Sequence, residues 1–180
     1  RRFAEPARDD AWGGSDFTFG DVTLRKPKHD NHELLGKTKF AGCLGVMKDV
    51  KRNKYTQNAK IEADCSVDGK EVYKLKSTAN TANWWYDHRI SLIDAKTFAD
   101  YRTEYFKGGK HIKTIDRSWI SANLDDPRAS YWGYWYGKTN TTGHETMAFI
   151  PSTITKVNHK YKKKNLWSTS TLRKIPKKIK

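Results

Sequence analysis

The sequence lacks the features that mark several large protein classes. No stretch approaches the run of about 20 apolar residues that a membrane-spanning helix needs, so we expect no transmembrane segment. The chain also contains no P-loop, dinucleotide-binding glycine motif, nucleophile elbow, zinc-protease motif or calcium-binding loop. We therefore assign no catalytic residue, no metal ligand and no cofactor, and we expect a protein that is not an enzyme.

Acidic residues are scarce towards the carboxyl end of the chain. Residues 1–90 contain 17 basic and 13 acidic side chains, whereas residues 91–180 contain 18 and 7, and no Asp or Glu occurs after residue 145. The formal net charge of +15 is therefore concentrated in a basic tail. We predict that its ten basic residues bind a partner: Lys156, Lys160, Lys162, Lys163, Lys164, Arg173, Lys174, Lys177, Lys178 and Lys180.

Cysteine is nearly absent. Cys43 and Cys65 lie in neighbouring predicted strands, 22 positions apart, and neither belongs to a C-x-x-C pair. They could form a disulfide in an oxidising compartment or remain two thiols in a reducing one. The sequence is compatible with a location in an organelle, outside the cell or in a virion. The sequence has no initial Met and no leader, which predicts a processed chain.

The length of 180 residues and the 36% hydrophobic content suit one domain with tails. We divide the chain into an amino-terminal arm (1–14), a β-rich domain (15–155) and a basic carboxyl-terminal tail (156–180). Strands are predicted from residue 16 onwards, within residues 37–50 and 59–65, after the turn at residues 67–70, and around residues 83–93, 112–120 and 131–136. Short apolar runs follow at residues 148–150 and 154–157.

The predicted fold is mainly β, an antiparallel sandwich or a jelly-roll-like barrel with basic arms. One short helix is predicted from Thr97 to Lys107, because Phe98, Tyr101 and Tyr105 recur at helical spacing before a pair of glycines. An α+β fold is the alternative.

Aromatic residues are abundant and clustered. Five of the six residues from 131 to 136 are Tyr or Trp, more than one face of a strand can bury. Exposed rings could stack on sugars, on bases or on a protein surface. The predicted contact residues are Trp84, Trp85, Trp132, Trp135 and Trp167.

These observations lead us to predict a non-catalytic structural or scaffolding subunit of a larger multi-subunit complex. Its basic tail and exposed aromatics would bind acidic protein subunits or nucleic acid, as in a small capsid protein. A binding module for carbohydrate or single-stranded nucleic acid is the first alternative, and acidic polysaccharide is a further candidate partner.

The second alternative is an enzyme with a basic cleft. A ribonuclease would draw on His144, Glu145 and His159, and a polysaccharide lyase on Tyr105, His111 and Arg102, as donors and acceptors of protons and as counter-charges. His29 and His32 lie in a polar loop that could in principle hold a metal, but nothing else in the sequence supports such a site.

Overall fold

The computed structural model describes residues 9–23, 26–54, 57, 61–151, 155 and 168–172. Short helical turns occur at η1 (Trp12–Gly14), α1 (Phe19–Val22), η2 (Pro27–His29) and α2 (Thr169–Leu172). The strands are β1 (Asp30–Lys39), β2 (Glu71–Ala79), β3 (His88–Asp94), β4 (Asp100–Lys107), β5 (Lys110–Ser121), β6 (Ser130–Thr139) and β7 (Glu145–Phe149).

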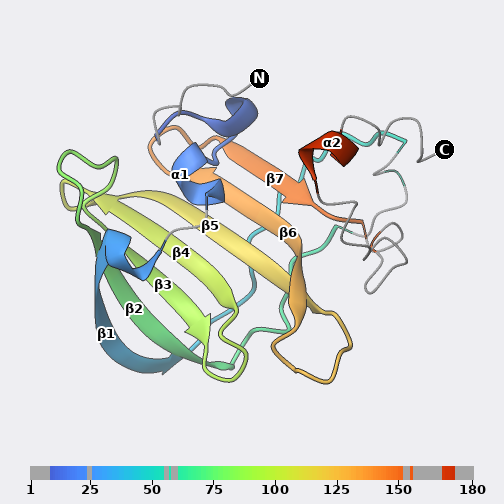
Figure 1. Cartoon of the computed structure of the whole chain (residues 1–180), viewed down its shortest axis with the longest axis horizontal. Coiled ribbons are helices and arrows are strands. Elements are labelled where there is room, and N and C mark those ends of the chain that lie inside the picture. Colours follow the sequence, from blue (N-terminus) through green and yellow to red (C-terminus); the bar gives the residue numbers. More distant parts are fainter. Residues whose placement is uncertain are drawn as a thin grey trace.

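All seven strands lie in one curved sheet in the order β1 to β7 (Figure 1). Every neighbouring pair is antiparallel. The prediction of a mainly β, antiparallel fold is therefore confirmed. The strands form a single open sheet that follows the chain order, whereas the sequence predicted two packed sheets or a closed barrel.

The helix predicted from Thr97 to Lys107 is wrong, because this segment contains β4. Tyr101, Thr103 and Tyr105 are buried at every second position, which is the period of a strand. Gly108 and Gly109, predicted to end a helix, instead form the tight turn between β4 and β5 with positive φ angles of 55° and 73°. The aromatic pattern of this segment is also compatible with a helix. The segment forms a strand because it pairs with β3 and β5.

The predicted strand from residue 16 is replaced by α1. The Thr18 side chain accepts a hydrogen bond from the Asp21 amide, and the Asp21 carboxylate accepts one from the Thr18 amide. This reciprocal capping box satisfies amides that an isolated helical turn would leave unpaired. No strand forms at residues 61–65 either, and β2 pairs instead with β1.

Different segments cover the two faces of the sheet. In β5, Lys113, Ile115 and Arg117 point to the face against which α1 packs, and Asp116 and Ser118 point to the opposite face. We call the first the α1 face and the second the disulfide face. In Figure 1, α1 lies over β5 and β6.

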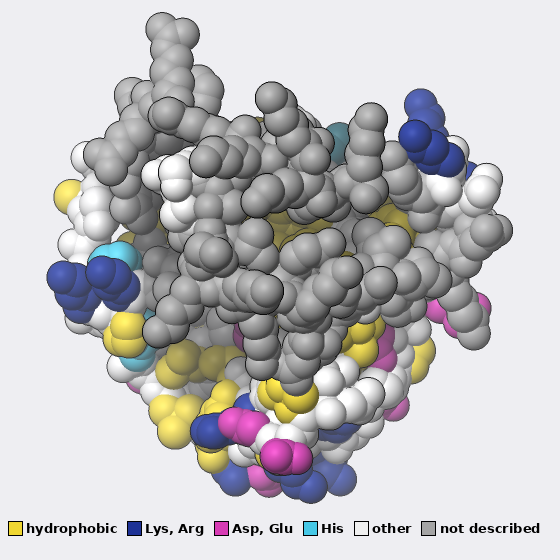
Figure 2. Space-filling model, turned by 45° about the vertical axis from the view of Figure 1, so that its right-hand side comes forward, with side chains coloured by type: hydrophobic (Ala, Val, Ile, Leu, Met, Phe, Trp, Pro, Cys, Tyr) yellow, Lys and Arg dark blue, Asp and Glu magenta, His cyan; other side chains and the backbone are white. Residues whose placement is uncertain are grey.

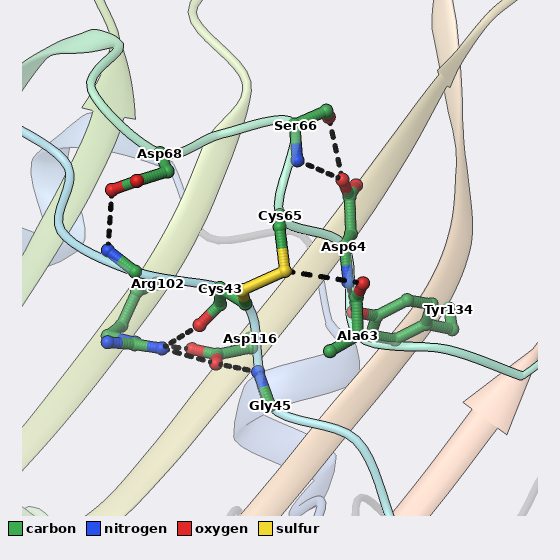
Figure 3. Close-up of a disulfide and its surroundings, with 11 residues drawn as sticks. Cys43, Gly45, Ala63, Asp64, Cys65, Ser66, Asp68, Arg102, Asp116 and Tyr134 are labelled. Atoms are coloured by element: carbon green, nitrogen blue, oxygen red, sulfur yellow. Dashed lines mark hydrogen bonds and ion pairs between the residues drawn. A yellow bond between two sulfur atoms is a disulfide. The ribbon is translucent and has the colours of Figure 1, made fainter.

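The disulfide face is covered by residues between β1 and β2. Cys43 and Cys65 are joined in a disulfide with an Sγ–Sγ distance of 1.95 Å. Beside it, Asp116 on β5 accepts hydrogen bonds from Arg102 and from the Gly45 amide (Figure 3). The apolar core here consists of Phe40, Leu44, Val67, Val72, Ala99, Tyr101, Tyr134 and Tyr136.

The smaller core on the α1 face consists of Phe17, Tyr86, Tyr105 and Ile115. The ring of Phe17 lies 5.8 Å from that of Trp135 and packs over Gly137, where an added Cβ would come within 2.9 Å of it.

The described helices include none with the length and apolar character that crossing a membrane requires.

Candidate functional site

The segment around α1 is fastened to the sheet by a buried lysine. Lys113 Nζ lies 2.5 Å from the Asp21 carboxylate and 3.1 Å from the Asp16 carbonyl oxygen. The same ammonium lies 4.1 Å from the centre of the Trp85 ring. Burial lowers the pKa of Lys113, although the charge of Asp21 opposes that effect. These contacts hold α1 at a set distance above β5.

A second group of contacts fastens the start of this segment. The buried Asp16 carboxylate accepts hydrogen bonds from the hydroxyls of Thr139 and Thr146, and its Oδ2 lies 2.7 Å from Nδ1 of His144. These three partners belong to β6, β7 and the turn between them. The amino-terminal segment therefore spans β5, β6 and β7 on the α1 face.

A pocket of about 400 Å³ lies between α1 and the α1 face of the sheet. This volume falls within the range of small-molecule sites in proteins. One wall is α1 with Thr23, and the other consists of side chains from β3 to β6 and the loop before β3. Its lining residues are Gly20, Asp21, Val22, Thr23, Tyr86, Arg89, Asp100, Tyr105, Arg117, Trp119 and Trp135.

Two arginines reach the pocket from the sheet. Arg117, whose side chain is only 6% exposed, forms an ion pair of 3.0 Å with Asp100 and donates a hydrogen bond to Thr103. Arg89 forms a longer ion pair of 3.4 Å with the buried Asp30. Tyr105 also lines the pocket. Burial raises the pKa of its phenol well above the usual value, so the phenol stays neutral.

Three buried polar atoms of the pocket lining have no hydrogen-bond partner among the described residues. They are Nε of Arg89, Nε1 of Trp135 and Oδ1 of Asp21. A buried donor or acceptor without a partner costs about 1 to 3 kcal/mol. All three atoms are buried within the walls of the pocket.

The lining of the pocket combines aromatic and charged side chains. Four aromatic rings supply apolar contact area, and four charged side chains among them can orient a ligand. The part of the chain that the structure describes contains no cluster of three or more His, Cys, Asp or Glu residues able to hold a metal. His32 instead contacts the Ser77 hydroxyl and the Pro27 carbonyl oxygen.

The predicted aromatic contact residues separate into two groups. Trp135 lines the pocket and contacts Trp132, with 5.5 Å between ring centres. Trp84 and Trp85 pack against Tyr86 beside the pocket. Trp167 and all ten predicted basic residues, from Lys156 to Lys180, lie outside the described residues, and their role remains a prediction.

The residues considered for catalysis are not brought together. Tyr105 is buried on the α1 face, whereas Arg102 binds Asp116 on the disulfide face. Glu145 accepts a hydrogen bond from Tyr136, and His144 lies against Asp16. His159 lies outside the described residues.

Sequence reasoning missed the charged residues of the pocket. Arg89 follows His88 in β3, Arg117 lies between Asp116 and Ser118 in β5, and Asp21 follows a glycine in what we expected to be a strand. A charged residue in a buried strand is uncommon and signals a paired or functional group. That signal was present, but it did not indicate that both arginines would line one pocket.

No protein-family model and no curated protein matches the sequence. Solved structures do match the fold. A putative outer membrane lipoprotein-sorting protein domain from Vibrio parahaemolyticus aligns with a TM-score of 0.59 and 14% identity, over 92% of this chain and 57% of its own length. A DUF1329 family protein from Desulfovibrio piger aligns with a TM-score of 0.58 and 13% identity, over 96% and 59%. A LolA superfamily protein from Nitrosomonas europaea aligns with a TM-score of 0.52 and 14% identity, over 86% and 64%.

These likenesses correct the predicted function. A structural or scaffolding subunit, a capsid-like role and polyanion binding through acidic subunits, nucleic acid or polysaccharide are wrong. The matching structures are named as a lipoprotein-sorting protein domain, a DUF1329 family protein and a LolA superfamily protein. The alternatives, a module for carbohydrate or single-stranded nucleic acid and a basic-cleft enzyme, find no support in them. The expected absence of enzymatic activity is compatible with these names.

The chain spans between 57% and 64% of the solved proteins it matches. The identities of 13–14% are low, so the likeness concerns the fold. The chain thus has the fold of a lipoprotein-sorting protein domain and of a LolA superfamily protein.

Proposed function

We propose that this chain is the ligand-binding part of a carrier for lipid-modified ligands. The pocket between α1 and the sheet would hold the apolar part of the ligand close to the polar atoms of the lining. The observation that carries this proposal is the pocket of about 400 Å³, walled by Trp119, Trp135 and Tyr105, in a fold shared with a lipoprotein-sorting domain.

Apolar side chains extend the α1 face beyond the pocket. Leu34 on β1 is paired with Leu75 on β2 and is 61% exposed. Near them the rings of Tyr73 and Phe98 stack, and Phe98 is also 61% exposed. Exposed apolar groups gathered on one face are typical of binding surfaces. They would give a long acyl chain a continuation from the pocket towards β1.

Figure 2 shows hydrophobic side chains at the surface, with Lys and Arg side chains around the outer margin of the view. Such an arrangement would offer apolar contact to a ligand and keep the protein hydrated elsewhere.

The disulfide indicates the compartment. Disulfides persist in secreted and periplasmic proteins and are rare in reducing compartments. A carrier that holds Cys43 and Cys65 in a disulfide would act in an oxidising space, where exported lipid-modified proteins are handled.

Tryptophan quenching tests the proposal. A monoacylglycerol with bromine atoms on its acyl chain should quench the fluorescence of the protein on titration, because heavy atoms quench only rings that they contact. Replacing both Trp119 and Trp135 by Phe should remove a large part of the quenching, since both rings line the pocket.

The matched control is Trp12→Phe, because Trp12 is exposed and does not line the pocket. This variant should be quenched by the lipid as strongly as the unaltered protein. Saturable quenching that is unchanged in the double variant would place the lipid elsewhere. Absence of saturable quenching in the folded protein would remove the proposed function altogether.

A further inference from the structure

The charged side chains in and beside the pocket wall form three ion pairs. Four of the six residues line the pocket, and the other two contact lining residues. The pairs are Arg117 with Asp100, Arg89 with Asp30, and Lys113 with Asp21. While all three pairs are closed, the formal charges of three cations and three carboxylates cancel.

The three carboxylates differ in how firmly they are held. The side chain of Asp21 is 1% exposed, and it accepts two hydrogen bonds from Thr18 in addition to its ion pair. The side chain of Asp30 is also 1% exposed. The side chain of Asp100 is 35% exposed, and among the described residues its carboxylate contacts only Arg117. Of the three, Asp100 alone can turn to water without leaving a charge buried and unpaired.

Arg117 is held in place without Asp100. Its side chain is 6% exposed, it donates a hydrogen bond of 3.2 Å to the Thr103 hydroxyl, and its guanidinium carbon lies 4.5 Å from the centre of the Trp135 ring. The backbone of Asp100 is fixed separately, because Trp119 donates a hydrogen bond of 3.0 Å to its carbonyl oxygen. The carboxylate can therefore turn away while the guanidinium stays in the aromatic wall.

The charge of the site then favours one kind of ligand head. When the Asp100 carboxylate turns to water, two carboxylates remain against three cations, and the wall has a net charge of +1. A head with one negative charge restores the balance and forms charge-assisted hydrogen bonds with Arg117, which are stronger than those between neutral groups. A neutral head supplies no such counter-charge, so the pair of Arg117 and Asp100 stays closed.

Resting on the proposed function, we propose that this pocket binds acyl ligands with a monoanionic head, a carboxylate or a phosphodiester, and that Arg117 is the anchor for the head. In the protein without ligand, the Asp100 carboxylate occupies the position of the head. The ligand displaces Asp100 to water, and its acyl chain lies against Trp119 and Trp135. Asp100 is therefore an internal competitor that lowers the affinity for anions.

Three ligands with the same decanoyl chain test this assignment. Decanoate and decanoyl lysophosphatidylglycerol each carry one negative charge, and monodecanoylglycerol carries none. Each is titrated at pH 7.5 against the protein carrying N-phenyl-1-naphthylamine, an uncharged fluorescent probe, and displacement of the probe gives the affinity. In the unaltered protein both anions should bind more tightly than the neutral ligand. Arg117→Gln should remove that difference, with circular dichroism showing that the variant is folded.

Asp100→Asn is the decisive variant, because it removes the competing charge and preserves the shape of the side chain. Both anions should bind on the order of tenfold more tightly to this variant, the scale of a charge-assisted hydrogen bond, and the neutral ligand should bind as before. The matched control is Asp126→Asn. It changes the net charge by the same amount and also frees an arginine, Arg128, but at an exposed site that does not line the pocket.

The outcomes separate this inference from the proposed function. A gain in Asp100→Asn confined to one of the two anions supports the site and identifies its head as a carboxylate or a phosphodiester. The inference is overturned if neither anion gains, if monodecanoylglycerol gains equally, if Asp126→Asn produces the same gain, or if the neutral ligand binds the unaltered protein as tightly as the anions do. In these cases the proposed function stands as long as monodecanoylglycerol displaces the probe. If no ligand displaces the probe from the folded protein, both fail.

Discussion

Arg102 donates two hydrogen bonds of 2.7 Å, one to each carboxylate oxygen of Asp116. Asp116 is 1% exposed and also accepts the Gly45 amide at 2.6 Å, and Arg102 reaches the Cys43 carbonyl oxygen at 3.2 Å. This pair therefore links β4 and β5 to the segment that covers the disulfide face (Figure 3). It belongs to the support of the sheet, on the face opposite the pocket.

Breaking this pair should be costly. Arg102→Ala leaves the buried Asp116 carboxylate without its counter-charge, and we expect a loss of about 3 to 5 kcal/mol in the free energy of unfolding. Urea unfolding followed by circular dichroism measures it. Arg128→Ala is the control, because Arg128 binds Asp126 with the same two-bond geometry at an exposed site. The control should change stability far less, because exposed ion pairs contribute little, and equal losses in the two variants would contradict the prediction.

Reduction of the disulfide should destabilise the protein. Cys43 and Cys65 are separated by 22 residues, and the loop entropy of a cross-link of this length corresponds to roughly 3 kcal/mol. We expect a lower midpoint of thermal unfolding with reductant and in the double variant Cys43→Ser, Cys65→Ser. Reductant should have no further effect on the double variant. A midpoint insensitive to reductant would show that the cross-link does not support the covering segment.

Acid should weaken the fold through Asp94. Burial raises the pKa of this carboxyl, but hydrogen bonds from the Thr97 and Lys96 amides and the Tyr101 hydroxyl outweigh burial, so the pKa is lowered overall. A carboxyl with a lowered folded-state pKa stabilises the protein above its unfolded pKa of about 3.9 and loses that contribution as the pH falls. Asp94→Asn should therefore show a shallower loss of unfolding free energy between about pH 5 and pH 3. Identical slopes for the variant and the unaltered protein would refute this.

The position of α1 should control ligand affinity from a distance. Phe17 does not line the pocket but anchors the start of α1 against Trp135 and Gly137. Phe17→Ala should cost about 3 to 5 kcal/mol of stability and also weaken binding of N-phenyl-1-naphthylamine, because one wall of the pocket loses its support. Binding is compared at a temperature where circular dichroism shows both proteins folded. Trp12→Ala, in the exposed turn before α1, should change neither quantity, and unaltered probe affinity in Phe17→Ala would separate α1 from the site.

The class of fold followed from the sequence because its signals are local. Alternating apolar residues and glycine turns predicted most of the strands and an antiparallel arrangement, and the aromatic cluster at residues 131–136 predicted what became β6. The helix prediction from Thr97 to Lys107 is wrong, because the spacing of Phe98, Tyr101 and Tyr105 fits a helix while Tyr101 and Tyr105 also fit the alternation of a strand. Only the pairing of this segment with β3 and β5 decided for a strand.

The pocket, by contrast, was decided by tertiary structure alone. Its walls come from Asp21 on α1, Arg89 on β3, Arg117 on β5 and Trp135 on β6, which lie far apart in the chain. Each strand's alternation divides its residues between the two faces, but the register between strands determines which of them become neighbours. The sequence alone shows which residues are charged or aromatic. The pairing of distant strands and the packing of α1 on the sheet place these residues around one cavity.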